Sequence, residues 1–175
     1  DAALDGVRGR LRLLLVGDGP QRTDLEAQVD ALGMRSRVTF TGQVSHSEVP
    51  AWLKRLDVYV AASRLDSESF GVAVIEASSC GLPVVVSDVG GLPEVVQHDV
   101  TGLVVPRDDS AALCAALKQL VLDDGLREAM GRAGRALVQR EYEWERCVDK
   151  MVDCYDWVVQ QHGAPVIAGS RQAAR

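Results

Sequence analysis

The chain alternates short apolar runs with stretches of helical spacing, and this alternation limits the fold more than any other feature of the sequence. Five runs have the length of a strand and end near glycine, proline or polar residues. They are residues 11–16, 38–40, 57–61, 83–86 and 103–105. Strands that alternate with helices form a parallel sheet covered on both faces. The sequence therefore predicts an α/β fold.

Local signals place the helices between these runs. Leu25, Val29 and Leu32 are spaced by four and three residues and are followed by Gly33, which indicates a helix with a glycine stop. Ser45 and Glu48 form a capping box at the start of another helix. Further helices are expected over 71–81, 94–97, from Ser110 as the N-cap, over about 123–138 and over 144–160. We expect one domain over 11–160, with a polar leader over 1–10 and a frayed tail over 161–175.

Composition excludes several classes of partner. The net charge is −6, and no basic stripe with interleaved aromatic residues is present, which argues against nucleic-acid binding. No apolar run approaches the roughly 20 residues of a membrane span, and no signal peptide opens the chain. The four cysteines form no C-x-x-C pair and have no histidine at metal-ligand spacing. We expect a cytoplasmic protein with reduced thiols and no metal site, and peripheral contact with the inner face of a membrane stays open.

The segment 66–76 carries the chemistry. It follows a predicted strand and opens a helix at Gly71, and ligands of open parallel sheets lie beyond the carboxyl ends of the strands. A helix start offers free amides and a partial positive charge, which suit a diphosphate. Gly71 lacks a Cβ atom, so a ligand can approach the backbone closely.

Two carboxylates flank this helix start, Glu68 before it and Glu76 in its second turn. An ionised carboxylate accepts two hydrogen bonds at once, so a ribose diol suits Glu76 and sugar hydroxyls suit Glu68. Two glutamates eight residues apart are also common on solvated helices. Glu76, however, stands among Val74, Ile75 and Ala77, where an unpaired carboxylate is costly.

Other conspicuous side chains have simpler interpretations. Arg64 and Arg107 are the arginines near the site loops, and a solvated surface position is the favoured interpretation for both. His46 and His98 are interpreted as surface residues of loops. The three tryptophans fall on helical faces and are expected to pack rather than to stack on sugars; they are Trp52, Trp144 and Trp157.

Taken in order, these segments resemble glycosyltransferase family 4, also described as group 1. The resemblance rests on six blocks and a late YEWE at 142–145. The blocks are 16–20 (VGDGP), 40–42 (FTG), 68–76 (ESFG, then Glu76), 80–88 (CGLPVVVSD), 90–94 (GGLPE) and 101–106 (TGLVVP). The resemblance covers about residues 11–160 and implies the C-terminal, Rossmann-like, donor-binding domain of a two-domain GT-B enzyme.

The resemblance implies roles for individual residues. Glu76 would bind the ribose and Glu68 would be the catalytic residue that contacts the transferred sugar. Backbone contacts to the donor are implied at Val44, Ser69, Phe70, Gly71 and Val72. Gly90, Gly91 and Glu94 would lie on the cleft rim, although a tight turn and a helix start also explain them.

The implied activity is retaining transfer of a sugar from an NDP-sugar to a glycan or a lipid-linked acceptor. A UDP-sugar is favoured on frequency alone, and no metal or other cofactor is expected. The acceptor would be bound by an N-terminal domain outside this chain, so this chain alone is expected to be inactive.

One departure from the family concerns the first strand and helix, which usually precede the VGDGP block and carry an arginine and a lysine that grip the diphosphate. Only ten residues precede Leu11. Because the first strand of such a sheet is central, we expect a gap in the sheet or an exposed strand edge. A strand-exchanged or edge-paired dimer would satisfy such an edge.

Three alternatives stay open. Gly17 and Gly19 follow a strand as in a dinucleotide-binding motif, but Arg22 stands where the third glycine belongs, and binding of NAD rather than UDP would favour that class. A GT-B-type epimerase is opposed by the block 68–76. A non-catalytic nucleotide-sugar-binding module would bind nucleotide without transfer even in the full-length protein.

Overall fold

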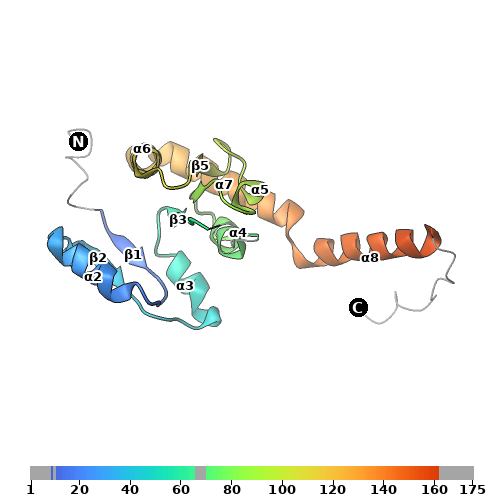
Figure 1. The fold of residues 1–175 in the computed structure, drawn as a ribbon. Helices are drawn as coiled ribbons and strands as arrows, with labels where there is room; N and C mark the ends of the chain where they lie inside the picture. Colours follow the sequence, from blue (N-terminus) through green and yellow to red (C-terminus); the bar gives the residue numbers. More distant parts are fainter. Residues whose placement is uncertain (1–8, 10, 66–69, 162–175) are drawn as a thin grey trace. The chain divides into compact units, whose positions relative to one another are not determined.

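The structure is a computed structural model that describes residue 9, residues 11–65 and residues 70–161 (Figure 1). Each of the five predicted apolar runs contains a strand. The strands are β1 (Leu13–Leu15), β2 (Val38–Phe40), β3 (Tyr59–Ala61), β4 (Val84–Ser87) and β5 (Gly102–Val105). Every strand pair is parallel, and helices alternate with the strands, so the predicted α/β fold is confirmed.

The helices follow the predicted order. The α-helices are α2 (Arg22–Ala31), α3 (Val49–Leu53), α4 (Val72–Ser79), α5 (Leu92–Val95), α6 (Ser110–Leu122), α7 (Asp124–Glu141) and α8 (Trp144–Gln161). Two 3₁₀ helices, η2 (Arg35–Arg37) and η3 (His46–Glu48), complete the set within the described residues.

Two predicted helix starts were wrong by a residue or two. Ser110 is the first residue of α6, and Asp109 is the N-cap, because its carboxylate accepts a hydrogen bond from the amide of Ala112 at 2.8 Å. Helix α5 begins at Leu92 rather than at Glu94, since Pro93 fits the first turn of a helix, where no amide donor is needed.

The strands form two sheets instead of one. β1 pairs with β2, and β4 lies between β3 and β5, and among the described residues no strand pairing joins the two groups. Leu13 of β1 is 46% exposed and Val60 of β3 is 39% exposed, although both strands are apolar. Pairing of these strands with a second copy stays a prediction.

Strand β4 is the centre of the core. Val84, Val85 and Val86 are fully buried, and because successive side chains of a strand point to opposite faces, both faces of the sheet are covered here. Helices α4 and α5 contact β4, and α6 contacts β4 and β5. One buried cluster joins β4, β5, α6 and α7; it consists of Val85, Leu103, Val105, Ala116, Leu120 and Met130.

Residues 1–136 and 137–175 form two compact units. In the second unit, α8 has no buried residue, and Trp144 and Trp157 are 79% and 61% exposed, so the expectation that these two tryptophans pack was wrong. No helix among the described residues is long and apolar enough to cross a membrane.

Two glycines of α7 differ in the space around them. A Cβ atom on Gly131 would lie 2.0 Å from the carbonyl oxygen of Gly81, whereas one on Gly134 would lie 3.5 Å from the Ser78 side chain. Only Gly131 therefore permits a close backbone approach between α7 and the turn after α4.

We predict that Gly131→Ala destabilises the protein by about 1–3 kcal/mol, since the added methyl group has no room and the backbone must shift. Gly134→Ala is the matched control, and it should be neutral or stabilising by up to about 1 kcal/mol because alanine favours a helix. Urea unfolding followed by circular dichroism measures both. Equal unfolding free energies for the two variants would contradict the close approach at Gly131.

Candidate functional site

The start of α4 has the geometry that the sequence predicts for an anion site. Gly71 is its N-cap, with φ at 77°, in the left-handed region that glycine adopts without strain. The amides of Val74 and Ile75 donate to the carbonyl of Gly71 at 2.9 and 3.2 Å, which begins the helical hydrogen-bond pattern. The first amides of a helix have no acceptor inside the helix, and such amides can bind an anion.

Packing fixes this helix start. Gly71 is buried, and a Cβ atom there would lie 2.8 Å from Leu92 Cδ2 and 3.4 Å from Val95 Cγ2. Helix α5 thus lies directly against the first residue of α4. Gly90, which was predicted to lie on the cleft rim, forms the turn before α5 and has a φ of 52°. Glu94, also predicted for the rim, is an exposed residue of α5. The segment 90–94 therefore lies beside the start of α4.

Glu76 lies on α4 with 31% of its side chain exposed. Its carboxylate makes no hydrogen bond to any residue that the structure describes. The imidazole of His46 lies close to it, with Nδ1 3.9 Å from Glu76 Oε1. A half-covered carboxylate with unused acceptor capacity is suited to a ligand that carries hydroxyl groups.

The turn after β2 approaches the same helix. Val44 is half-buried and lies two residues before His46, so its backbone belongs to the segment that faces Glu76. Gly42 precedes it with φ at 73° and accepts a hydrogen bond from the amide of Gly17 at 3.0 Å. This bond ties the carboxyl ends of β1 and β2 together.

The other predicted donor residues divide into two groups. Phe70 and Val72 flank the buried Gly71, and these two residues are 44% and 60% exposed. Glu68 and Ser69 lie outside the described residues. The structure therefore brings Val44, Glu76 and the residues beside Gly71 into one region.

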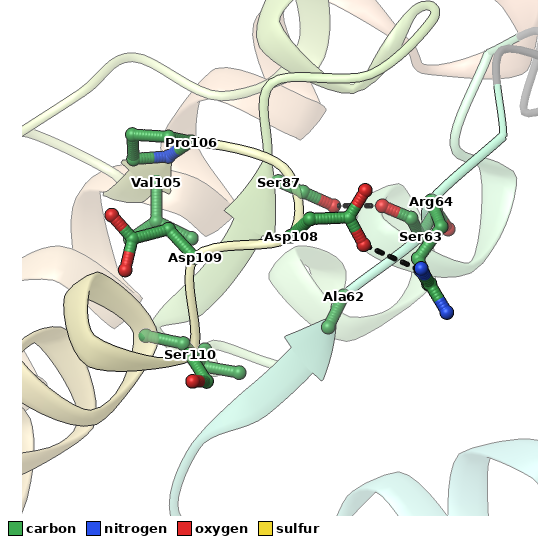
Figure 2. Close-up of a pocket in the computed structure, with 10 residues that line it drawn as sticks. Ala62, Ser63, Arg64, Ser87, Val105, Pro106, Asp108, Asp109 and Ser110 are labelled. Atoms are coloured by element: carbon green, nitrogen blue, oxygen red, sulfur yellow. Dashed lines mark hydrogen bonds and ion pairs between the residues drawn. The ribbon is translucent and has the colours of Figure 1, made fainter.

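A separate hollow of about 280 Å³ lies beyond the carboxyl ends of β3, β4 and β5 (Figure 2). Its described lining includes neither Gly71 nor Glu76. The lining residues are Ala62, Ser63, Arg64, Ser87, Val105, Pro106, Asp108, Asp109, Ser110 and Leu113.

Several polar groups of this hollow are engaged with one another. Arg64 Nε donates to Asp108 Oδ1 at 2.5 Å, and the Ser87 hydroxyl donates to the Ser63 carbonyl at 2.6 Å (Figure 2). Asp108 holds a φ of 57°, which an aspartate tolerates better than most residues. The first pair links the loop after β3 to the turn before α6, and the second links that loop to the end of β4. The polar groups of the hollow are therefore accounted for in part by contacts that hold the loops together.

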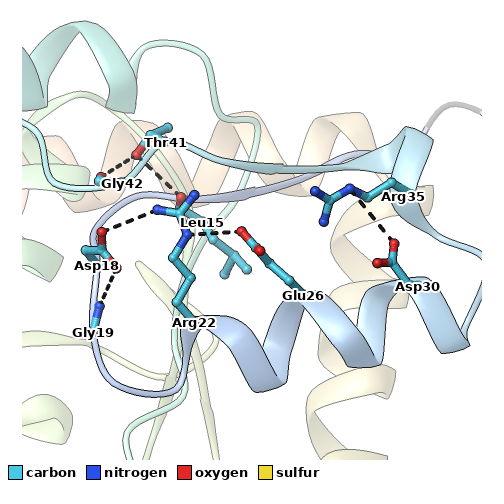
Figure 3. A network of polar contacts seen from close by, with 9 residues as sticks. All are labelled: Leu15, Asp18, Gly19, Arg22, Glu26, Asp30, Arg35, Thr41 and Gly42. Atoms are coloured by element: carbon cyan, nitrogen blue, oxygen red, sulfur yellow. Dashed lines mark hydrogen bonds and ion pairs between the residues drawn. The ribbon is translucent and has the colours of Figure 1, made fainter.

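A polar network holds the turn after β1 (Figure 3). Arg22 Nε donates to Glu26 Oε1 at 3.0 Å, and its Nη1 donates to Asp18 Oδ2 at 3.4 Å. The hydrogen bond with Glu26 raises the pKa of Arg22 above its ordinary value. The guanidinium also lies over the Phe40 ring at 5.8 Å, so Arg22 is occupied in shaping the turn next to Gly42.

For two side chains, the structure shows a contact that the sequence analysis did not predict. His46 was interpreted as a surface residue, and although it is exposed, it is the group that faces Glu76. Arg64 is 76% exposed, as expected, but it pairs with Asp108. In the sequence, the signal that could have indicated the contact with Glu76 was the position of His46, two residues after the predicted donor residue Val44. Within the described residues, no cluster of three or more metal-binding side chains occurs.

The parallel strands, the order of the motifs and the glycine-led helix define a Rossmann-like domain of the glycosyltransferase type. The chain belongs to the glycosyltransferase group 1 family, because the profile described as "Glycosyl transferases group 1" matches residues 3–137.

Two curated relatives illustrate the similarity. A GDP-mannose-dependent alpha-(1-6)-phosphatidylinositol monomannoside mannosyltransferase of Mycobacterium tuberculosis is 36% identical over an alignment of 159 residues, and the match covers 86% of this chain and 41% of the relative. The alpha-D-kanosaminyltransferase of Streptomyces kanamyceticus is 33% identical and is matched over 85% of this chain and 38% of its own length. The chain thus spans about two fifths of the relatives that it matches.

Two solved structures are similar to this chain in both sequence and fold. Sucrose-phosphate synthase of Thermosynechococcus elongatus is 34% identical with a TM-score of 0.77, covering 91% of this chain and 41% of that one. The C-terminal domain of a glycosyl transferase group 1 family protein, LpcC, of Francisella tularensis is 26% identical with a TM-score of 0.73, covering 82% of this chain and 75% of that one. The predicted family is confirmed.

We predict that Gly71→Ala destabilises the protein more than Gly33→Ala does. Both residues have positive φ values, 77° and 63°, so each alanine incurs a left-handed backbone cost of roughly 1–2 kcal/mol. Only at Gly71 does the methyl group also meet a side chain, that of the fully buried Leu92. Thermal unfolding compares the two variants, and an equal loss would mean that α5 does not hold the start of α4.

Proposed function

We propose that this chain is the nucleotide-sugar-binding part of a retaining glycosyltransferase, which transfers a sugar from an NDP-sugar to a glycan or lipid-linked acceptor. The observation that carries the proposal is the partly exposed carboxylate of Glu76, which makes no hydrogen bond to a described residue and lies on helix α4, whose N-cap is Gly71. The carboxylate suits a diol and the helix start suits a diphosphate, and an NDP-sugar contains both groups.

The base, the ribose and the diphosphate of the donor would each contact a different part of the candidate site. The base lies against the backbone near Val44, and the ribose hydroxyls donate to Glu76. The diphosphate lies at the amides at the start of α4, beside Gly71. Ser69 would add a backbone contact to the sugar or the diphosphate, in keeping with the family motif.

The chemistry follows from the leaving group. As the bond between the anomeric carbon and the phosphate oxygen breaks, negative charge develops on the diphosphate, and the amides at the start of α4 stabilise it. Glu68 orients the sugar and offsets the positive charge on its ring. The acceptor oxygen forms the new bond on the face that the phosphate leaves, and its proton passes to the departing phosphate oxygen. The proposal includes no metal or other cofactor, as the family resemblance implies.

The rest of the polypeptide would bind the acceptor. The matched relatives are more than twice as long as the segment that corresponds to this chain, which leaves room for a second domain. We propose a cytoplasmic enzyme, with peripheral membrane contact where the acceptor is lipid-linked. Relatives named for phosphatidylinositol monomannoside and for kanosamine show that the family serves acceptors and sugars of several kinds.

We predict that the intact protein binds a nucleoside diphosphate and that Glu76→Ala weakens this binding roughly tenfold to a hundredfold, because a hydrogen bond to a charged group is lost. Isothermal titration calorimetry with UDP, GDP and ADP measures it. UDP is the base favoured by the sequence, and GDP is included because the mycobacterial relative is named for GDP-mannose. Glu128→Ala is the matched control, since Glu128 is an exposed glutamate of α7.

Absence of binding by all three nucleotides would refute the proposed function. Binding of NAD in their place would favour an oxidoreductase. Equal affinities of the Glu76→Ala and Glu128→Ala variants would remove Glu76 from the site while leaving nucleotide binding intact.

We predict that Glu68→Gln lowers the kcat of sugar transfer by the intact enzyme roughly tenfold to a hundredfold, because the neutral amide no longer offsets charge on the sugar. Glu128→Gln should leave kcat unchanged. The anomeric configuration of the product, read by nuclear magnetic resonance in the same assay, should match that of the donor. An inverted product, or an unchanged kcat in Glu68→Gln, would contradict the proposed chemistry, and nucleotide binding without any transfer would favour a binding module.

A further inference from the structure

His46 and Glu76 come from different elements and face one another. His46 is the first residue of η3, after β2, and Glu76 lies in the second turn of α4. Their closest polar atoms, Nδ1 and Oε1, are 3.9 Å apart. The imidazole is 89% exposed, so a ligand can reach it from solvent.

The backbone of His46 is fixed by its neighbours. Glu48 accepts a hydrogen bond from the amide of Ser45 at 3.0 Å, and the Ser45 side chain accepts from the amide of Glu48, so the predicted capping box is present. Glu48 also accepts a hydrogen bond from the Ser45 hydroxyl at 2.5 Å. The hydroxyl bond is the larger of the effects that lower the pKa of the Glu48 carboxyl below its ordinary value. Glu48 therefore stays ionised at neutral pH, and the helical turn that carries His46 stays in place.

The separation between the imidazole and the carboxylate is too long for a direct hydrogen bond, which for nitrogen and oxygen is about 2.7–3.2 Å. A contact of this length leaves room for an oxygen atom beside both groups. With the imidazole proton on Nδ1, an atom there accepts a hydrogen bond from Nδ1 and donates one to the carboxylate. A hydroxyl group does both, whereas a carbonyl, a phosphate or an ammonium group does only one.

We propose that His46 and Glu76 together bind one hydroxyl group of the nucleotide's ribose. His46 Nδ1 donates to the hydroxyl oxygen, and the hydroxyl hydrogen is donated to Glu76 Oε1. This inference rests on the proposed function and adds to it a second ribose ligand, which lies outside the sequence motifs that identify the family.

The pair has a consequence for selectivity. A deoxyribose at the bridged position loses the hydrogen bonds to both the imidazole and the carboxylate, so its affinity falls by more than the loss of one bond would cause. His46 thus contributes to the preference for ribonucleotides over deoxyribonucleotides. Water has the same hydrogen-bonding capacity as a hydroxyl group, so the test must separate a bridging water from a ribose oxygen.

The experiment measures affinities of the intact protein by isothermal titration calorimetry for UDP and GDP and for their 2′-deoxy and 3′-deoxy forms. His46→Ala should weaken binding of the ribonucleotide roughly threefold to tenfold, the effect of one hydrogen bond. For the deoxy form that lacks the bridged hydroxyl, wild type and His46→Ala should bind equally. His46→Asn should restore part of the affinity, because its amide nitrogen occupies nearly the place of Nδ1.

Ser47→Ala is the matched control. Ser47 is the next residue of η3, and its hydroxyl lies 3.1 Å from that of Ser45, so the variant perturbs the same turn without removing the imidazole. It should bind all nucleotides as wild type does. A loss in Ser47→Ala equal to that in His46→Ala would show a disturbed turn and would overturn the inference.

Two further results separate the inference from the proposed function. In the first, wild type binds nucleotide and Glu76→Ala weakens this binding, but His46→Ala either binds as wild type does or loses affinity by the same factor for the ribonucleotide and both deoxy forms. The inference is then wrong and the proposed function stands. If wild type binds no nucleotide, the function fails and the inference fails with it.

Discussion

The burial of β4 on both faces is the constraint on which the rest of the structure depends. Val84, Val85 and Val86 exclude solvent completely, which requires helices on each side of the sheet. The neighbouring strand then approaches so closely that a Cβ atom at Gly102 would lie 2.3 Å from the carbonyl oxygen of Val84. Parallel pairing directs the carboxyl ends of β3, β4 and β5 to one edge, and the loops that can bind a ligand leave from that edge.

The candidate site follows from this packing. Helix α4 contacts β3 and β4, and its first turn is held by α5 through the contact between Gly71 and Leu92. The glycine serves two purposes there, since it adopts a positive φ and leaves no Cβ atom between the helices. A helix start that is packed in this way keeps its amides in place before a ligand arrives, and the proposed function relies on this property.

The second sheet brings in the other half of the site. β1 and β2 are joined at their carboxyl ends by the bond between Gly17 and Gly42, and the chain then continues through η3 to His46. The imidazole of His46 lies 3.9 Å from the carboxylate of Glu76, although no strand pairing within the described residues joins the two sheets. A side-chain contact at the candidate site thus brings η3 and α4 together, although backbone hydrogen bonds do not join the two sheets. Membership of the glycosyltransferase group 1 family gives this arrangement its context.

The sequence by itself determined the strands, the helix order, the family and the position of Gly71, because these depend on spacing between near neighbours and on local backbone preference. The capping box of Ser45 and Glu48 was predictable for the same reason. Only the tertiary structure decided that His46 faces Glu76, thirty positions later, and that Arg64 pairs with Asp108, 44 positions later. Such contacts depend on how whole elements pack, and no local pattern in the chain encodes the distance between two side chains that belong to different elements.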